Sequence, residues 1–88
     1  MAVYVDWMQT TIPNKNWPYK TGCHLMADTE KELHGFAVSV LGLKRSWFQP
    51  HSKHPHYDLT RSKRHLAIKN GAVEIGSDWY KGKGIEKK

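Results

Sequence analysis

The chain has 88 residues, which fits a single domain with a small core, because a chain of this length buries only about 60% of its unfolded surface. Its formal net charge is +6, which favours an anionic partner such as a nucleotide or a nucleic acid. The single cysteine, Cys23, excludes an internal disulfide and is typical of a reducing compartment. No stretch approaches the roughly 18 apolar residues of a membrane span, so we expect a soluble, cytoplasmic protein without a membrane partner.

The excess positive charge lies in one third of the chain. Residues 43–69 contain seven cationic residues and one acidic residue, whereas the remainder of the chain is neutral. The seven are Lys44, Arg45, Lys53, Arg61, Lys63, Arg64 and Lys69. A solvated basic surface is one interpretation of this segment. The confinement of the whole excess to one segment favours the other, a binding face for an anion.

Two strands and a long loop are expected in the first part of the chain. Residues 2–6 (AVYVD) combine β-branched and aromatic side chains and predict a strand. Residues 7–21 contain two prolines and predict a long loop, a kind of segment that is often functional in a small domain. Residues 23–27 (CHLMA) predict a second strand.

A helix is predicted over residues 30–41. Thr29 and Glu32 have the spacing of a capping box, in which each residue satisfies a backbone N–H of the first turn. Apolar residues then recur at the helical period, and Gly42 supplies the left-handed stop.

A second helix is expected to run to Asn70 and to be stopped by Gly71, with Thr60 or Asp58 as its N-cap. Lys63 lies on the inward row of this helix, where an apolar residue is usual. Its stem either covers the core, with the charged head in water, or reaches toward a rim or a bound anion. Arg64 is one step around the helix and would reach the same rim.

The order of the elements predicts the fold class. Further short strands are expected at residues 46–49 (SWFQ) and 72–75 (AVEI). Strand-strand-helix-strand-helix-strand is the pattern of a single small α/β domain, over residues 1–76, with a mixed, partly parallel sheet of about four strands and two helices. Residues 77–88 lack periodicity and are rich in glycine and lysine, so they are expected to form a flexible basic tail.

In α/β sheets, ligands collect beyond the carboxyl ends of the strands, where helix N-termini present free N–H groups. Asp6 ends the first predicted strand, Asp28 ends the second, and Tyr57 to Thr60 open the second helix. If the strands run parallel, these three places converge on one rim and form a composite site.

The residue types near this rim suit phosphate chemistry. Histidines act as general acid and base near neutral pH, and cations stabilise phosphoryl oxygens. The candidate catalytic residues are His24, His34 and His56. The candidate ligand-binding residues are Asp6, Asp28, Gln49, Tyr57, Lys63 and Arg64.

Other chemistries receive less support from the sequence. The H-x-H-x-D run would place His54, His56 and Asp58 on one face of an extended segment, which is a metal-ligand pattern, but a weak one. We therefore expect no metal and no other cofactor. Cys23 and His24 are adjacent on a strand and point to opposite faces, so a catalytic pair is disfavoured and a buried structural thiol is expected. Common nucleotide-binding loops with a glycine-rich signature are absent.

The order and spacing of several short motifs resemble one family. The motifs are VYVD (3–6), CHLMAD (23–28), ELHGFA (32–37), LGL (41–43), WFQ (47–49) and HYDLT with KR and GA (56–72). Together they resemble the small bacterial and phage family called domain of unknown function 4031. The resemblance implies a protein of this size and no established activity. It includes His24, Asp28, His34, Phe48, Gln49, His56, Tyr57, Asp58 and Arg64, and it excludes His51, His54 and His65.

Three functions remain open from the sequence. The leading hypothesis is a module that binds a phosphate-bearing ligand, either a nucleotide-like small molecule or a nucleic-acid backbone. If it is phage-encoded, a host protein is a further candidate partner. The second hypothesis is a small phosphoester-processing or nucleotide-processing enzyme with histidine as general acid and base. The third is a structural interaction domain, whose polar residues tie down the long loops.

Overall fold

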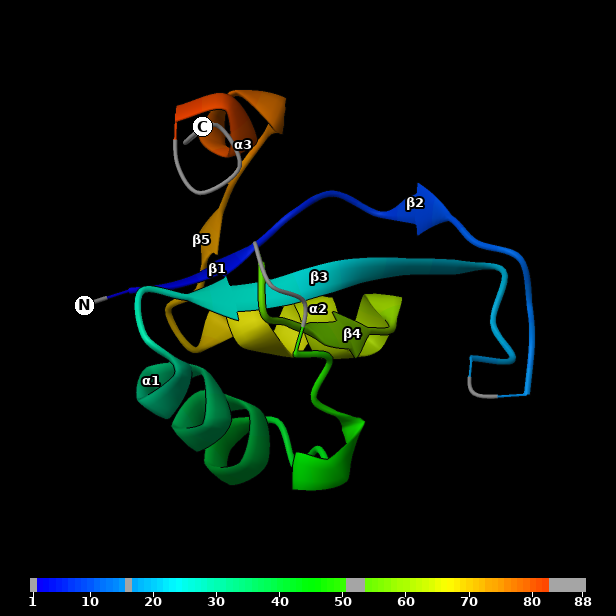
Figure 1. Ribbon diagram of the computed structural model, residues 1–88, viewed down its shortest axis with the longest axis horizontal. Coiled ribbons are helices and arrows are strands. Elements are labelled where there is room, and N and C mark those ends of the chain that lie inside the picture. The colour runs from blue at the N-terminus through cyan, green and yellow to red at the C-terminus, as the bar shows by residue number, and fades with distance from the viewer. Residues whose placement is uncertain (1, 16, 51–53, 83–88) are drawn as a thin grey trace.

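The computed structural model describes residues 2–15, 17–50 and 54–82. Its centre is a five-stranded sheet, shown in Figure 1. The strands are β1 (Val3–Val5), β2 (Gln9–Thr10), β3 (Thr21–Ala27), β4 (Tyr57–Leu59) and β5 (Val73–Glu74). The long strand β3 pairs antiparallel with β1, β2 and β4, and β1 pairs parallel with β5. The sheet is therefore mixed and partly parallel, as predicted, with five strands in place of about four.

The first predicted helix is confirmed. Helix α1 (Glu30–Gly35) continues directly into the π-helical turn η1 (Phe36–Val40). Thr29 is the N-cap, and its side-chain oxygen accepts a hydrogen bond from the backbone N–H of Glu32 at 3.2 Å. Gly42 follows with a φ of +71°, the left-handed conformation that glycine adopts without steric cost.

The second predicted helix is present, and of its two expected N-caps the structure has Thr60. Helix α2 (Arg61–Lys69) has Thr60 as its N-cap, and Gly71 follows it with a φ of +103°. Asp58 is the middle residue of β4 and does not cap the helix. The missed strand has only three residues, and Tyr57 and Leu59 are buried on either side of the less buried Asp58. This alternation is the strand period, but three residues are too few to reveal it in the sequence.

The prediction of a strand at residues 46–49 is wrong. Residues Arg45–Trp47 form a 3-10 turn, η2. Gln49 alone of that segment pairs with another strand-like residue, through an isolated antiparallel bridge to His56. Aromatic content favoured a strand here, but the Trp47 side chain is half exposed rather than packed against a sheet.

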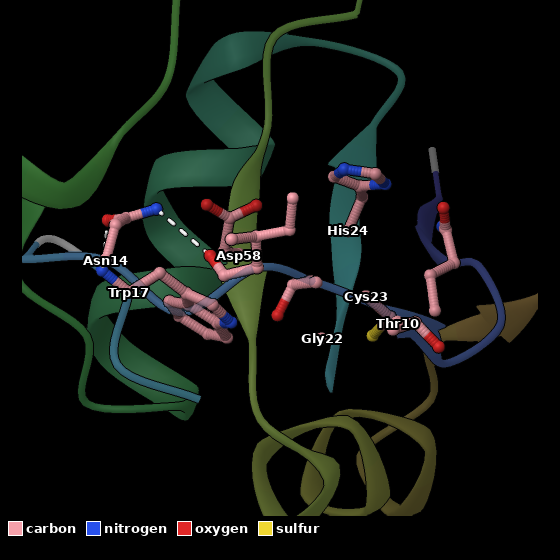
Figure 2. Close-up of a pocket in the computed structure, with 10 residues that line it drawn as sticks. Thr10, Asn14, Trp17, Gly22, Cys23, His24 and Asp58 are labelled. Carbon is pink, nitrogen blue, oxygen red and sulfur yellow. Dashed lines mark hydrogen bonds between the residues drawn. The ribbon is translucent and has the colours of Figure 1, made fainter. Parts of the chain in front are cut away.

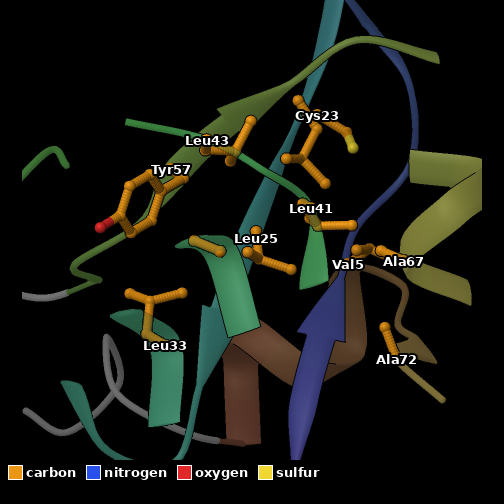
Figure 3. Close-up of a cluster of buried hydrophobic side chains, with 11 residues drawn as sticks. Val5, Cys23, Leu25, Leu33, Leu41, Leu43, Tyr57, Ala67 and Ala72 are labelled. Atoms are coloured by element: carbon orange, nitrogen blue, oxygen red, sulfur yellow. The ribbon is translucent and has the colours of Figure 1, made fainter. Parts of the chain in front are cut away.

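The core lies between the sheet and helices α1 and α2, which cover one face of the sheet (Figure 1). Its buried side chains are shown in Figure 3: Val5, Cys23, Leu25, Leu33, Ala37, Leu41, Leu43, Tyr57, Leu59, Ala67 and Ala72. Cys23 belongs to this cluster, and burial raises the pKa of its thiol to about 12. The thiol is therefore a buried core group, as expected.

A third helix, α3 (Ser77–Gly82), lies on the other side of the sheet (Figure 1). Its Trp79 ring packs against Tyr4 of β1, with ring centroids 5.2 Å apart. This helix occupies the first six residues of the segment expected to be a tail, and residues 83–88 lie outside the described part of the chain. Among residues 2–15, 17–50 and 54–82, no helix has the length and apolar character needed to cross a membrane.

Candidate functional site

The pleat of the sheet gathers polar side chains on the face opposite α1 and α2. Because strand residues alternate between faces, Leu25 and Tyr57 enter the core while their neighbours His24 and Asp58 point the other way. His24 and Asp58 lie directly opposite each other in the β3–β4 register. Asp6 follows β1, where its backbone N–H donates to the carbonyl of His24. With His56, these residues form what we call the histidine cluster: Asp6, His24, His56 and Asp58.

Asp6 holds His24 with both carboxylate oxygens. Asp6 is fully buried, and its Oδ1 accepts a hydrogen bond from the backbone N–H of His24 at 2.6 Å. Its Oδ2 lies 2.7 Å from Nδ1 of the His24 ring and also accepts from Gln9. A carboxylate only accepts, so Nδ1 carries the proton, and the lone pair of the neutral imidazole is on Nε2. The hydrogen bond that the His24 ring donates to Asp6 is the main cause of the raised pKa of His24.

His56 is oriented in the same way by a different group. Its Nδ1 lies 2.7 Å from the backbone carbonyl of His54, which only accepts, so Nδ1 is again the protonated nitrogen. The His56 ring meets the His24 ring edge to face, with centroids 4.6 Å apart. Nε2 of His56 lies 3.6 Å from Oδ1 of Asp58. The other oxygen of Asp58, Oδ2, accepts from the side-chain amide of Gln49 at 3.3 Å.

A pocket of about 300 Å³ borders the cluster. Figure 2 shows His24 and Asp58 on neighbouring strands, with Asn14 and Trp17 contributed by the loop that precedes β3. The lining residues are Gln9, Thr10, Thr11, Ile12, Asn14, Trp17, Gly22, Cys23, His24 and Asp58. The long loop between the first two predicted strands, which includes the short strand β2, therefore forms one wall of the pocket.

The pocket wall depends on a glycine in β3. A Cβ atom at Gly22 would lie 3.0 Å from the Trp17 ring, so only glycine lets the indole pack this closely on the strand. The indole N–H of Trp17 donates to the carbonyl of Thr21 at 3.2 Å and fixes the ring against the strand.

Four of the nine predicted site residues meet at this cluster. Asp6, His24 and His56 belong to it, and Gln49 supports it through Asp58. Asp58 itself was interpreted mainly as a helix cap. The sequence did not identify Gln9, Thr10 or Trp17 as site residues, because their place depends on how the loop folds back on β3.

Two other predicted residues form a separate pair on the helix side of the sheet. Nδ1 of His34, on α1, lies 2.9 Å from the hydroxyl of the fully buried Tyr57. The His34 ring also packs edge to face on Phe48, with centroids 4.6 Å apart. This pair joins α1 to β4 and lies across the sheet from the histidine cluster.

Asp28 lies at the opposite end of β1 from Asp6. The strands β1 and β3 are antiparallel, so the end of β3 meets the start of β1. There Asp28 accepts hydrogen bonds from the backbone N–H of Ala2 at 2.9 Å and from the hydroxyl of Tyr4 at 2.7 Å. The expected convergence of Asp6 and Asp28 on one rim required parallel strands and does not occur.

Lys63 and Arg64, the two cations predicted to bind phosphate, donate hydrogen bonds to backbone carbonyls of the protein. Nζ of Lys63 donates to the carbonyl of Leu41 at 2.8 Å, at the C-terminal end of η1. Nε of Arg64 donates to the backbone carbonyl of Asp6 at 2.7 Å, and its Nη2 lies 3.2 Å from Glu74. Lys63 therefore ties two helical elements together, and Arg64 supports the backbone behind the cluster.

The cluster contains a set of potential metal ligands. One ligand atom from each of His24, His56 and Asp58 lies within 4.8 Å of the others. His54, the first residue of the H-x-H-x-D run, contributes its backbone carbonyl, while its ring packs near Trp79 with centroids 6.0 Å apart.

Comparison with known proteins identifies a family. The model of a family described as "Protein of unknown function (DUF4031)" matches residues 3–82. Neither a curated protein nor a solved structure matches the chain.

Proposed function

The chain belongs to the DUF4031 family of proteins of unknown function, and we propose that its pocket binds a small phosphate-bearing molecule of the nucleotide class. One observation carries the proposal: the pocket of about 300 Å³ ends at the oriented side chains of His24 and Asp58. A small-ligand site is typically a concave pocket of about 300–1,000 Å³ with a few convergent polar groups. This pocket is at the small end of that range and suits one compact ligand.

The chemistry of the lining supports a ligand with several polar groups and one flat face. Gln9 and Asn14 offer side-chain amides, and Thr10 and Thr11 offer hydroxyls, so hydrogen bonds to a sugar or a base are available. Trp17 adds an aromatic surface to the same wall, and nucleobases stack on aromatic side chains.

The charge of the chain supports an anion as the ligand. A net charge of +6 raises the local concentration of anions around a protein of this size. Lys63 and Arg64 donate to backbone carbonyls, so in this proposal the phosphate group faces the histidine cluster rather than these two cations.

A second candidate function is phosphoester hydrolysis, and the Asp6–His24 pair favours it. A buried carboxylate that holds Nδ1–H of a histidine leaves the Nε2 lone pair to accept a proton from water. His56, whose ring lies 4.6 Å from that of His24, would then act in its doubly protonated imidazolium form and donate its Nε2 proton to the leaving group. Two oriented imidazoles beside a pocket are more than simple binding requires.

Binding is tested by calorimetry and thermal unfolding with nucleoside monophosphates, the matching nucleosides and inorganic phosphate. We expect a nucleotide to raise the melting temperature of the full chain by mass action. Trp17→Ala should weaken that binding at least about tenfold, since base stacking on an aromatic side chain contributes about 1–3 kcal/mol. Trp47→Ala is the matched control, because Trp47 is half exposed and does not line the pocket. Equal loss in both variants, or no binding by the wild type, would reject the proposal.

Hydrolysis is tested by product analysis after incubation with nucleotides and with a chromogenic phosphodiester. His24→Gln should abolish turnover, and His65→Gln should retain it, because His65 is exposed on α2. If all three proteins show the same background rate, the enzyme candidate is abandoned and the binding proposal stands on the calorimetry alone.

A further inference from the structure

We propose that His24, His56 and Asp58 bind one divalent transition-metal ion, with an open coordination position toward the pocket. The metal site stands on the geometry of the cluster. The role of the metal toward phosphate, which is to supply the positive charge that such a ligand needs, rests on the proposed function. The residues come from two strands and the segment that precedes one of them, so the fold rather than a local motif brings them together.

The separations of the ligand atoms fit a metal ion. All three atoms lie within 4.8 Å of one another. Nε2 of His56 and Oδ1 of Asp58 are 3.6 Å apart. Two ligands at tetrahedral positions around zinc, with bonds near 2.1 Å, are about 3.4 Å apart. The His56–Asp58 edge thus has nearly the required length, and the ligand atom of His24 lies within 4.8 Å of the other two.

Each of the three side chains is oriented through the atom that would not bind the metal. Asp6 fixes Nδ1–H of His24, the carbonyl of His54 fixes Nδ1–H of His56, and Gln49 fixes Oδ2 of Asp58. This is the usual support of metal ligands, in which a carboxylate or carbonyl accepts from the second nitrogen of each histidine. Such support sets the tautomer that presents Nε2, and it also raises the basicity of the imidazole. Three supports of this kind in one cluster are difficult to explain by packing alone.

The donor set selects the class of metal. Imidazole nitrogens suit zinc and other first-row transition ions, whereas magnesium and calcium prefer all-oxygen sites. Two histidines and one carboxylate are the protein ligands of several catalytic zinc sites, in which the fourth position holds water or substrate. His24 and Asp58 both line the pocket, so the fourth position faces the proposed ligand.

A bound metal ion would also offset the negative charge of the histidine cluster. Two carboxylates, those of Asp6 and Asp58, lie beside the proposed phosphate position, and carboxylates repel phosphate. A divalent ion reverses the local charge and would coordinate a phosphate oxygen directly. In the loaded protein the metal occupies Nε2 of His24, so a metal-bound water rather than His24 would serve as the base in the hydrolysis candidate.

The test is isothermal titration of the tag-free, EDTA-treated chain with Zn²⁺, with Mg²⁺ as the comparison ion. We expect one Zn²⁺ per chain and much weaker binding of Mg²⁺. His24→Ala, His56→Ala and Asp58→Asn should each lower the Zn²⁺ affinity at least about tenfold, which is the lower end of the effect of perturbing a metal site.

Two matched histidine variants decide which residues are ligands. His54→Ala keeps the backbone carbonyl that orients His56, and His65→Ala removes an exposed histidine of α2, so both should bind Zn²⁺ as the wild type does. Loss of binding in His54→Ala with retention in His24→Ala would overturn the assignment in favour of the H-x-H-x-D run. Equal binding by all variants would overturn the site altogether.

Folding is checked for each variant by circular dichroism. Asp58→Asn keeps its shape and the Gln49 contact, so it remains informative if a histidine variant does not fold. Substitution by Co²⁺ gives a second measurement, because its visible absorption reports nitrogen and oxygen ligation. Absorption that is unchanged in Asp58→Asn would contradict the proposed ligand set.

Failure of the metal site and failure of the proposed function give different results. Zn²⁺ binding that depends on His24, with no nucleotide effect on melting in either metal state, rejects the proposed function and retains the metal site. Nucleotide binding that is unchanged by EDTA, in a protein that shows no Zn²⁺ titration, rejects the metal site and retains the proposed function.

Discussion

At the scale of single residues, Asp6 connects the histidine cluster to helix α2. It is fully buried, and its side chain orients His24 through both oxygens while its own carbonyl accepts from Arg64. A buried carboxylate is costly unless its oxygens receive such hydrogen bonds. The sequence placed Asp6 at the end of a strand, but nothing in it could identify His24, eighteen residues later, as the partner.

Replacing Asp6 by asparagine should lower the pKa of His24. The carboxylate raises that pKa, chiefly through its hydrogen bond, and a neutral amide removes the charge while keeping the shape. In the wild type this contact stabilises the fold below the ordinary histidine pKa of 6.5, and the contribution is lost as the pH rises through the raised pKa of folded His24. The measurement is an NMR titration of the imidazole resonances. Asp78→Asn, on exposed α3, is the control, and an unchanged His24 titration in Asp6→Asn would contradict the geometry.

Lys63→Met tests whether Lys63 stabilises the fold or binds the ligand. We expect the free energy of unfolding to fall by about 1–2 kcal/mol, because a charged donor to the Leu41 carbonyl is lost. Ligand binding should be unaffected, since Lys63 does not line the pocket. Urea unfolding checks the first expectation and nucleotide calorimetry the second, with exposed Lys31→Met as the control. A stable Lys63→Met protein that no longer binds ligand would restore the phosphate role that the sequence favoured.

The burial of the Cys23 thiol can be tested in the wild-type protein, because the reactivity of the thiol is measured directly. Burial raises the thiol pKa to about 12, so at pH 8 the native protein should contain almost no thiolate and react very slowly with a disulfide reagent. The unfolded chain, with an ordinary thiol pKa near 8.5, should react rapidly. The raised pKa also means that stability falls as the pH rises from about 9 toward 12, because only the unfolded chain loses the proton readily. Fast labelling of the native protein would show that Cys23 is exposed by local opening.

At the scale of elements, helices α1 and α2 were predictable, whereas helix α3 and strand β4 were not. Helix α1, with its continuation η1, and helix α2 each have a side-chain cap before them and a left-handed glycine after them, and these signals are local in the sequence. Strand β4 has three residues, and its identity depends on pairing with β3, which is more than thirty residues earlier. For the same reason the direction of β1 and β3, on which the predicted rim depended, could not be obtained from local patterns.

Thr60→Ala tests the cap of α2. Its hydroxyl accepts from the backbone N–H of Lys63, and loss of an N-cap side chain typically costs about 1 kcal/mol of stability. Arg61→Ala, exposed in the first turn of α2, should change stability by a few tenths of a kcal/mol at most. Chemical unfolding of both variants measures the difference. Equal stabilities would show that the cap hydrogen bond does not form in solution.

At the scale of the whole molecule, the fold class and the family could be predicted, and the site only in part. Composition and element order are enough for a small mixed α/β domain. The site requires the register of β3 with β4 and the folding of the loop before β3 onto it, and both are long-range. The H-x-H-x-D run illustrates this limit: its last two positions do meet in the cluster, but the second histidine comes from β3.

Nucleic acid is the alternative partner that the sequence predicts. The salt dependence of binding tests this prediction. The basic segment from residue 43 to residue 69 would contact phosphates along a backbone, each contact lowering the logarithm of affinity by about 0.9 per tenfold rise in salt for duplex DNA. A charge-reversal variant of exposed Lys44 and Arg45 should reduce that slope. Affinity that does not vary with salt would exclude backbone binding as the function of this surface.

The central claim is that one cluster holds His24 and His56 with Nδ1 protonated and Nε2 directed to a common point. Long-range ¹H–¹⁵N NMR spectra of the imidazoles, recorded after titration to a pH at which both rings are observed to be neutral, report this directly. We predict the Nδ1–H tautomer for both His24 and His56, with both Nε2 resonances displaced on addition of one equivalent of Zn²⁺. The Nε2–H tautomer at either ring, or a spectrum that Zn²⁺ leaves unchanged, would contradict the cluster and the metal site built on it.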